Sequence, residues 1–269
     1  MLKFLTNNIS KNIKVMSMVK QIRKAIINKN IVSYFQPIVN NKTKKIEKYE
    51  SLVRLLDVNN NILLPDLFLG ISKNSNDYCY ITQQVLENSF LMLKMNNDVS
   101  VAINLSMSDI ENKDIRNMID CFLDEYAAYG KRIIFELLED ERINNFKLII
   151  TFINRIKKRG VKIAIDDFGS GYSNYERIFK LSPDIIKIDG SIIGNLQRST
   201  YSQDIVESLV YFSKKQGIKT VGEWVENEST YDILRNIGVD YSQGYYFGKP
   251  EMVKFLKKQT VKKFKRMPI

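Results

Sequence analysis

Short apolar runs alternate along the chain with longer segments whose apolar residues recur at helical spacing. Segments such as YITQQVLENSFLMLKM, IRNMIDCFLDEYAAYG and FKLIITFINRIKKRG predict amphipathic helices between most of the runs. Strands that alternate with helices predict a parallel sheet, and eight of them predict an α/β fold of the TIM-barrel type. The predicted strands are SYFQPIV, IEKYESLVRL, VSVAINLS, RIIFELLE, VKIAIDDFG, DIIKIDG, KTVGEWVE and YSQGYYFG.

One connection breaks this alternation. Only NNKTKK separates the first two runs, which is too short for the helical crossover that joins parallel strands. The first strand is therefore predicted to be antiparallel, which gives a modified TIM-like (β/α)8 barrel. No linker rich in glycine, proline or serine interrupts the sequence. We expect one domain over residues 19–255, after an N-terminal lead-in over residues 1–18 and before a basic tail over residues 256–269.

Polar residues recur on the predicted inner face of the barrel strands. Because side chains alternate along a strand, Asn104 shares a face with Ala102 in the run VAINLS. These residues lie near the C-terminal strand ends, where TIM barrels hold their active sites. Any one of them could be a structural group, but their joint position favours a functional site. The set is Glu50, Asn104, Glu136, Asp166, Asp167, Lys187 and Glu223.

The charges of this set indicate metal binding. Asp166 and Asp167 are adjacent carboxylates that repel each other unless a cation lies between them, although the pair alone is also compatible with a solvated turn that caps a helix. Five carboxylates and one lysine leave a formal charge of about −4, which two divalent cations would balance. Oxygen ligands favour Mg²⁺ or Mn²⁺, and Ca²⁺, which prefers another geometry, is expected to inhibit.

Two close metal ions suit the in-line attack of water on a phosphodiester. Arg54 follows Glu50 by four residues and is expected at the same rim of the barrel, where it could hold a phosphate oxygen. A magnesium enzyme of the enolase type also has carboxylates at the strand ends of a barrel. That alternative explains neither the early antiparallel hairpin nor the order of the polar motifs.

Composition excludes several other classes of chemistry. The 269 residues include no histidine, which argues against a zinc site or a Ser-His-Asp triad. Cys79 and Cys121 form no ligand cluster and imply no disulfide framework. No apolar stretch is long enough to span a bilayer, and the N-terminus lacks the apolar segment of a signal peptide. A soluble, cytoplasmic protein is expected.

The chain has a net charge of +11, which favours anionic partners. Much of this charge lies near the termini, as in KFLKKQTVKKFKR. The basic tail could contact a membrane or nucleic acid, but a charge run is usually a solvated helix face. Because the tail lacks interleaved aromatic residues and a base-reading motif, no nucleic-acid polymer is predicted as a partner and membrane contact has no support.

The sequence resembles the EAL-domain family of cyclic di-GMP phosphodiesterases. The signature is Glu50-Ser51-Leu52 within YESLVRL, with serine in place of the usual alanine, and the resemblance runs from YFQPIV to GYYFGKP. It implies hydrolysis of the bacterial second messenger cyclic di-GMP to linear pGpG with two Mg²⁺ or Mn²⁺ ions per site. It also implies a homodimer formed through the segment after the aspartate pair, around residues 170–200.

The resemblance assigns a role to each matching residue. Lys187 would orient or activate the attacking water, Glu223 is a candidate general base, and both join Glu50 as catalytic residues. Gln36, Arg54 and Gln243 match positions that contact substrate or its water network. Glu139 would steady the loop after the aspartate pair. The implied metal ligands are Glu50, Asn104, Glu136, Asp166, Asp167 and Glu223.

Two further departures from the family pattern bear on activity. Leu138 stands where the E-x-T-E motif has threonine, which removes a hydroxyl that could anchor the loop DDFGSGYS. Trp224 replaces the glycine after Glu223, and its indole would either pack outside the barrel or crowd the pocket. The alternative function is therefore a catalytically weak or inactive EAL-fold receptor for cyclic di-GMP or a protein-interaction module.

Overall fold

The computed structural model describes residues 2–73, 75, 77–138, 144–169 and 180–253. The chain divides into two compact units. The larger unit comprises Phe35–Leu52 and Ser89–Pro250, and the smaller one comprises Met1–Tyr34, Val53–Asn88 and Glu251–Ile269. The predicted basic tail, residues 256–269, lies outside the described residues.

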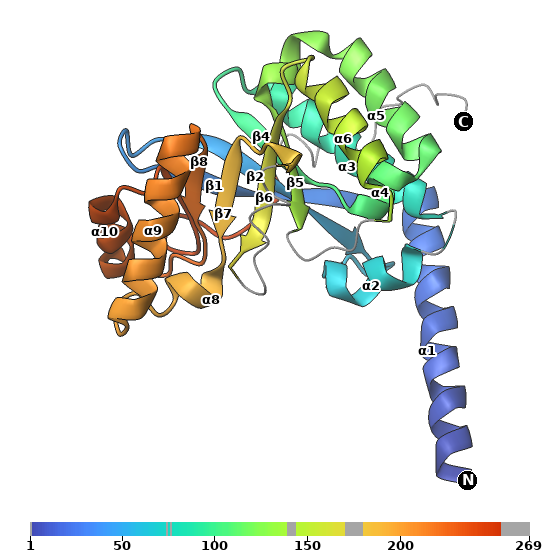
Figure 1. Ribbon diagram of the computed structural model, residues 1–269. Helices are drawn as coiled ribbons and strands as arrows, with labels where there is room; N and C mark the ends of the chain where they lie inside the picture. Colours follow the sequence, from blue (N-terminus) through green and yellow to red (C-terminus); the bar gives the residue numbers. More distant parts are fainter. Residues whose placement is uncertain (1, 74, 76, 139–143, 170–179, 254–269) are drawn as a thin grey trace. The chain divides into compact units, whose positions relative to one another are not determined.

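The described strands form one nine-stranded sheet in the order β1-β9-β8-β7-β6-β5-β4-β2-β3, and an additional pairing of β1 with β2 closes it into a barrel (Figure 1). β1 is antiparallel to β9, whereas the pairs from β2–β4 to β8–β9 are parallel. This confirms the modified TIM-like barrel with an antiparallel first strand. The barrel strands are β1 (Ile31–Asn40), β2 (Ile46–Leu56), β4 (Ser100–Asn104), β5 (Ile133–Leu138), β6 (Lys162–Phe168), β7 (Ile185–Ile188), β8 (Lys219–Gly222) and β9 (Tyr241–Gln243).

The central strands are apolar on both faces except at single charged positions. Every residue of β7, with the sequence IIKI, is buried, and so are the first five residues of β5, with the sequence IIFELL. Such continuous apolar runs are expected in parallel strands that are covered by helices outside and by a packed interior. Glu136 in β5 and Lys187 in β7 interrupt these runs, so folding alone does not account for them.

Amphipathic helices cover the barrel of the larger unit. α6 (Phe146–Lys157) buries residues at helical spacing, including Ile149, Phe152 and Ile156, and contacts β6. The Asn145 side chain caps its first turn by accepting from the Leu148 amide. α9 (Thr200–Gln216) contacts β8 and α10 (Glu228–Ile237). The other helices of this unit are α4 (Met107–Glu111), α5 (Lys113–Glu125), the 3-10 helix η1 (Ala127–Arg132) and α8 (Gly190–Ile193), whereas α3 (Asp77–Met95) is divided between the two units after Asn88.

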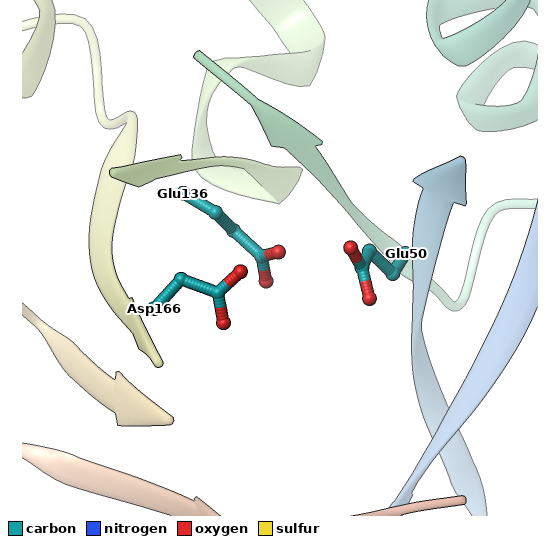
Figure 2. A group of neighbouring side chains, drawn as sticks. All are labelled: Glu50, Glu136 and Asp166. Atoms are coloured by element: carbon teal, nitrogen blue, oxygen red, sulfur yellow. The ribbon is translucent and has the colours of Figure 1, made fainter. Parts of the chain in front are cut away.

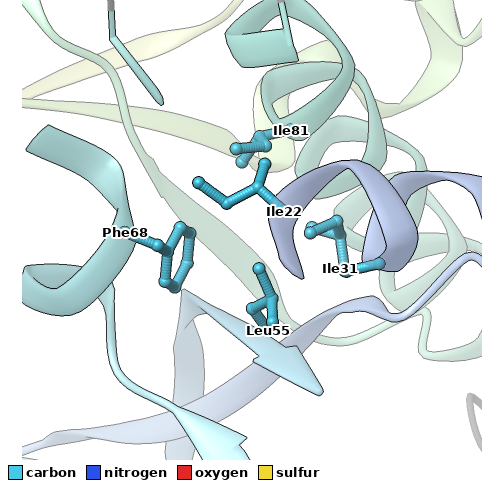
Figure 3. Close-up of a cluster of buried hydrophobic side chains, with 6 residues drawn as sticks. Ile22, Ile31, Leu55, Phe68 and Ile81 are labelled. Carbon is cyan, nitrogen blue, oxygen red and sulfur yellow. The ribbon is translucent and has the colours of Figure 1, made fainter. Parts of the chain in front are cut away.

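The smaller unit has an apolar core of its own. It contains α1 (Leu2–Ile27), α2 (Pro65–Ser72) and the short strand β3 (Ile62–Leu63), which pairs antiparallel with the end of β2. α1 is one continuous helix, so residues 18 and 19 lie in the same element. Within the described part of the chain, no helix is long and apolar enough to cross a membrane. Figure 3 shows the core, which is formed by Ile22, Ala25, Ile31, Leu55, Phe68 and Ile81.

Candidate functional site

The inside of the barrel is layered, and the layering follows from the two-residue period of the strands. A buried apolar layer consists of Ile38, Ala102, Ile134, Ala164, Ile185 and Val221, with Tyr241 packed against it. Two residues further along each parallel strand, the same face carries a polar group. β1 runs in the opposite direction, so its polar residue precedes Ile38. We call the resulting set the rim cluster: Gln36, Glu50, Asn104, Glu136, Asp166, Asp167, Lys187, Glu223 and Gln243.

A bulge in β6 brings both aspartates to the rim cluster. Ile165 pairs with Ile186 and Phe168 pairs with Ile188, so three steps along β6 face two along β7. Asp167 lies inside this bulge with a φ of 54°. Regular alternation would direct Asp166 and Asp167 to opposite faces, but carboxylate oxygens of both lie within 4.8 Å of one another and of Glu223.

Lys187 lies at the centre of the rim cluster and is only 1% exposed. Its Nζ is 2.8 Å from Asp166 Oδ1, 2.9 Å from Glu223 Oε1 and 3.0 Å from Glu136 Oε2. Glu50 Oε2 is 3.6 Å away. Because four carboxylates from different strand ends converge on one ammonium group, the lysine neutralises part of a charge that the fold would otherwise leave uncompensated.

Amide side chains hold Glu50 from two sides. Asn104 Nδ2 donates to Glu50 Oε1 at 2.8 Å, and Gln243 Nε2 donates to Glu50 Oε2 at 2.6 Å. Gln243 Nε2 also lies 3.2 Å from Gln36 Oε1, and Gln36 donates in turn to the Gly248 carbonyl at 3.3 Å. Figure 2 shows the carboxylates of Glu50, Glu136 and Asp166 directed toward one another. Of the predicted residues, Gln243 therefore contacts Glu50 directly, and Gln36 contacts Gln243.

Burial and charge shift the pKa of these groups in opposite directions. Burial alone would raise the pKa of Glu50, but Lys187 and the two amides lower it below its ordinary value. Burial raises the pKa of Glu136 well above its ordinary value even though Lys187 opposes the shift. Burial would lower the pKa of Lys187, yet the surrounding carboxylates raise it well above its ordinary value. Lys187 therefore stays protonated.

The carboxylates near the aspartate pair also bind protons more strongly than usual. Burial, with the added charge of Asp166, raises the pKa of Glu223 to about 8 even though Lys187 opposes the shift. Burial raises the pKa of Asp167 to about 6, and the charges of Asp166 and Asp189 add to the effect. Without a divalent cation, part of the cluster's excess negative charge is thus neutralised by protons, which a cation would displace.

The donor set fits divalent cations that prefer oxygen. Glu50, Glu136 and Asp166 each offer a carboxylate oxygen within 4.8 Å of the others, and Asp166, Asp167 and Glu223 form a second such group. The two groups share Asp166, an arrangement that suits two neighbouring ions. Gln243 Oε1 is buried at the same place and accepts no hydrogen bond from the residues that the structure describes. Such an atom is expected where an ion or an ordered water completes a site.

Two predicted residues remain, one in the smaller unit and one outside the described residues. Arg54 belongs to the smaller unit, where its guanidinium donates to the Val53 carbonyl and lies 5.6 Å from the ring centroid of Tyr34. Glu139 lies outside the described residues. Leu138 pairs with Asp166 across β5 and β6 and is 40% exposed. A threonine at position 138 would place its hydroxyl beside Asp166, the first residue of the sequence DDFGSGYS.

The other two departures from the family pattern are accommodated without blocking the barrel. The Ser51 hydroxyl accepts a hydrogen bond of 2.9 Å from the Ser89 hydroxyl in a buried pair. Trp224 is 69% exposed and its indole lies against Gly190, so the ring is outside the packed interior. Of the two positions that the sequence left open for the indole, the structure has the one outside the barrel.

Sequence reasoning missed one carboxylate near the site. Asp189 follows β7 directly and caps α8, where it accepts from the Ser191 amide at 2.9 Å and from the Ser191 hydroxyl. Its charge contributes to the raised pKa of Asp167. The signal was present in the run DIIKIDG, where Asp189 follows the apolar residues of the strand just as the aspartate pair does in VKIAIDDFG. Its position beyond the strand removed it from the inward-facing set.

The chain is similar in sequence to curated proteins. The chain is 31% identical over 242 residues to "Probable cyclic di-GMP phosphodiesterase PdeA" of Escherichia coli strain K12, a match that covers 88% of this chain and 33% of that protein. It is 30% identical over 236 residues to "Cyclic di-GMP phosphodiesterase PdeB" of Shewanella oneidensis, with 86% of this chain and 28% of that protein covered. The chain thus spans about a third of the length of these curated relatives.

Solved structures share the fold. The crystal structure of an EAL domain protein from Listeria monocytogenes EGD-e has a TM-score of 0.80 and 30% sequence identity, and the match covers 90% of this chain and 96% of that one. The EAL enzyme Bd1971 in its cAMP- and cyclic-di-GMP-bound form has a TM-score of 0.81 and 25% identity over 96% of this chain and 73% of that one. The sequence profile of the EAL domain matches residues 19–250. The chain belongs to the EAL domain family.

Proposed function

We propose that this chain hydrolyses cyclic di-GMP to linear pGpG with the help of two Mg²⁺ or Mn²⁺ ions. The observation that carries the proposal is the pair of carboxylate groups that share Asp166 at the mouth of the barrel. The printed names of PdeA and PdeB as cyclic di-GMP phosphodiesterases support the substrate and the reaction. The rival proposal is an EAL-fold receptor that binds the dinucleotide without cleaving it.

The rim cluster divides into groups with different tasks in this proposal. Bound divalent cations would acidify a water molecule and neutralise the charge that develops on phosphorus. Because oxygen donors suit these ions, the six ligands would be Glu50, Asn104, Glu136, Asp166, Asp167 and Glu223. Asn104 now donates its amide nitrogen to Glu50 and would turn its amide oxygen to the ion. To present six oxygen ligands, the site would therefore need a side-chain rotation at Asn104 and the loss of the protons that its carboxylates hold without metal.

Lys187 and Glu223 have complementary roles in proton movement. Since the pKa of Lys187 lies well above its ordinary value, the lysine acts as a fixed hydrogen-bond donor that orients the attacking water and balances charge. Glu223 Oε1 lies 2.9 Å from Lys187 Nζ at the end of β8, where a carboxylate can accept the proton that the water loses. We assign Glu223 as the general base and Lys187 as the orienting cation.

The remaining predictions complete the proposed site. Gln36 and Gln243 would contact the substrate or its water network, and Arg54 would hold a phosphate oxygen. Glu139 would steady the loop after the aspartate pair. We further propose that residues 19–255 form the catalytic domain and that two copies associate through residues 170–200. Light scattering of the purified chain tests this association directly.

The proposed activity is tested by incubating the purified chain with cyclic di-GMP and Mn²⁺ and following pGpG by chromatography. Glu50→Ala removes a carboxylate of the first metal group, so we expect turnover to fall by at least about 100-fold. Glu207→Ala, on the exposed face of α9, is the matched control and should retain wild-type turnover. Ca²⁺ in place of Mn²⁺ should occupy the site and inhibit.

Two results would contradict the phosphodiesterase assignment. Hydrolysis by Glu50→Ala at the wild-type rate would show that the carboxylate groups are not the site of reaction. Binding of cyclic di-GMP by the wild-type chain, without hydrolysis in either Mg²⁺ or Mn²⁺, would support the receptor instead.

A further inference from the structure

Trp224 has a backbone conformation that tryptophan rarely adopts. Its φ is 52°, in the left-handed region where a side chain with a Cβ is strained. It is the only tryptophan in the sequence, and it directly follows Glu223 of the rim cluster. Strain of this kind persists where the surrounding structure imposes it, and it is most common at functional sites.

Gly190 provides the surface on which the indole lies. A Cβ placed on Gly190 would meet three indole atoms of Trp224, Cγ, Cδ2 and Cδ1, at 2.3, 2.5 and 2.6 Å. The similar distances to three atoms of one five-membered ring indicate that the ring covers Gly190 with its face. Any larger residue at position 190 would displace the indole, so the glycine and the tryptophan form a matched pair.

The indole is fixed but not covered. One face lies on Gly190 at the start of α8, yet 69% of the Trp224 surface is exposed. The next residue, Val225, donates its amide to the Gln243 carbonyl at 3.0 Å and accepts from the Tyr246 amide at 3.0 Å. The segment that carries Trp224 is therefore attached at both sides to the rim cluster: Glu223 precedes Trp224 in the chain, and Val225 after it is bonded to the Gln243 backbone.

We propose that Trp224 stacks on one guanine base of cyclic di-GMP and so contributes to the choice of a purine dinucleotide. This inference rests on the proposed function and adds a specificity residue to it. A planar aromatic ring held at one face and exposed at the other suits a base, because every base presents a flat π surface. A neutral base also avoids the repulsion that the carboxylates at the mouth of the barrel would exert on an additional anion.

The geometry of the substrate favours this position for a base. In a cyclic dinucleotide each base is attached to the ring that contains both phosphodiesters. A phosphate held over the carboxylates of Asp166 and Glu223 therefore leaves a base within reach of the adjoining rim. Trp224 differs here from the glycine usual in this family, so the stacking surface would be a property of this chain.

The single tryptophan makes binding directly observable. Cyclic di-GMP is titrated into the full chain in Ca²⁺, and the tryptophan fluorescence is followed; stacking should quench it. Affinity is measured in parallel by calorimetry for the wild type, Trp224→Gly and Tyr211→Ala. Trp224→Gly should weaken binding by roughly 5- to 150-fold, the range expected for one base–aromatic stack. Tyr211→Ala, an equally exposed aromatic residue on α9, should bind as the wild type does.

Two further measurements separate stacking from a structural role. Trp224→Gly should fold at least as well as the wild type, because glycine adopts a positive φ without strain. Gly190→Ala keeps the tryptophan but displaces its ring, and it should weaken binding in the same direction. In Mn²⁺, both variants should have a higher KM, with a change in kcat of less than about twofold. The reason is that a stacked base is bound equally well in the ground state and in the transition state.

The outcomes distinguish this inference from the function on which it rests. Absence of dinucleotide binding to the wild-type chain overturns both proposals. Binding with unchanged fluorescence and equal affinity in Trp224→Gly overturns only the stacking role. Loss of a dimer in Trp224→Gly with unchanged affinity would assign the indole to contact between copies and would likewise overturn it.

Discussion

At the residue scale, Lys187 shows how one side chain can permit an otherwise unfavourable arrangement. Its Nζ lies within 3.0 Å of three carboxylates that belong to different strand ends. Removal of one partner from a buried ion cluster leaves charge without compensation, which is more damaging than replacing the whole cluster by apolar groups. The lysine is therefore as important for folding without metal as it is for the proposed reaction.

Lys187→Met should destabilise the metal-free chain by about 3–5 kcal/mol, because methionine fills the space but leaves the carboxylates repelling one another. Urea unfolding in EDTA measures the change. Lys219→Met is the matched control, since Lys219 pairs with Asp240 while 60% of its side chain is exposed, and surface pairs of this kind contribute little. An equal loss in both variants would contradict the central role of Lys187.

The sequence allowed most of the rim cluster to be predicted, but it failed where the backbone departs from regular alternation. Glu136 and Lys187 were recognised because each is a charged residue on a fixed face of an apolar strand. The orientation of Asp167 depends on a bulge that no periodic pattern contains. The position of the Trp224 indole depends on Gly190, which lies 34 positions earlier. The sequence does not show that these two residues are in contact.

At the element scale, β2 departs from the layered pattern of the barrel. Two residues before Glu50, where other strands place an apolar side chain, β2 places Lys48, which is only 6% exposed. Its Nζ lies 3.0 Å from the centroid of the Tyr241 ring. Burial lowers the pKa of Lys48 to about 7, although the charge of Glu47 opposes the shift. The position of a lysine in the apolar layer thus gives the fold a pH dependence.

The sign of that dependence follows from the two states. The unfolded chain holds the Lys48 proton up to its ordinary pKa of 10.5, whereas the folded chain releases it near pH 7. Between these values the unfolded state binds more protons, so Lys48 makes the free energy of unfolding rise with pH by up to about 1.4 kcal/mol per unit. Between about pH 8 and about pH 9.5 the tyrosines have not yet titrated. Glu223, with a pKa of about 8, titrates alike in the wild type and in a variant at position 48, so the difference between the two isolates the slope that Lys48 contributes.

Lys48→Met should remove this slope and stabilise the chain at pH 7, because the burial of an amine that prefers water is avoided. Urea unfolding at several pH values within the window gives the measurement. Lys113→Met, which changes an exposed lysine at the start of α5, should leave the slope in place. A variant at position 48 with the wild-type pH dependence would show that Lys48 is charged in the folded state.

At the scale of the whole molecule, the barrel concentrates negative charge that the rest of the chain does not offset locally. The chain has a net charge of +11, yet the rim cluster has five carboxylates and one lysine. Overall charge therefore says little about this site, and the local imbalance determines what binds there. Its ligands come from strands spread over most of the larger unit, so an ion bound there links the strands that close the barrel.

Divalent cations should therefore stabilise the folded chain. Mn²⁺ at 100 times its dissociation constant should add about 2.7 kcal/mol to the free energy of unfolding, and EDTA should reverse the effect. Thermal unfolding with and without metal measures it. Asp166→Asn, which alters the residue shared by both carboxylate groups, should lose most of the stabilisation, whereas Glu207→Ala should retain it. Equal stabilisation of all variants would place the bound ions elsewhere.

The global fold could be predicted from the sequence because the alternation of apolar strands with amphipathic helices is a local pattern. The short segment NNKTKK was enough to identify the antiparallel strand. The division into two units and the two-residue strand β3 could not be predicted, because both depend on which distant segments pack together. The smaller unit takes the start of β1 and the end of β2 while the larger unit takes the rest of both strands, and no local sequence pattern indicates that division.

The reversed first strand has a consequence for synthesis on the ribosome. β1 and β9 meet at Ile38 and Gln243, and the hydrogen bond from Gln243 to Glu50 joins residues 193 positions apart. Because a nascent chain emerges from its N-terminus, Glu50 is exposed long before its partner exists. The seam of the barrel closes only when the last strand arrives. A prematurely terminated product that lacks β9 would keep all five carboxylates of the rim cluster but present open strand edges, which invite pairing with other chains.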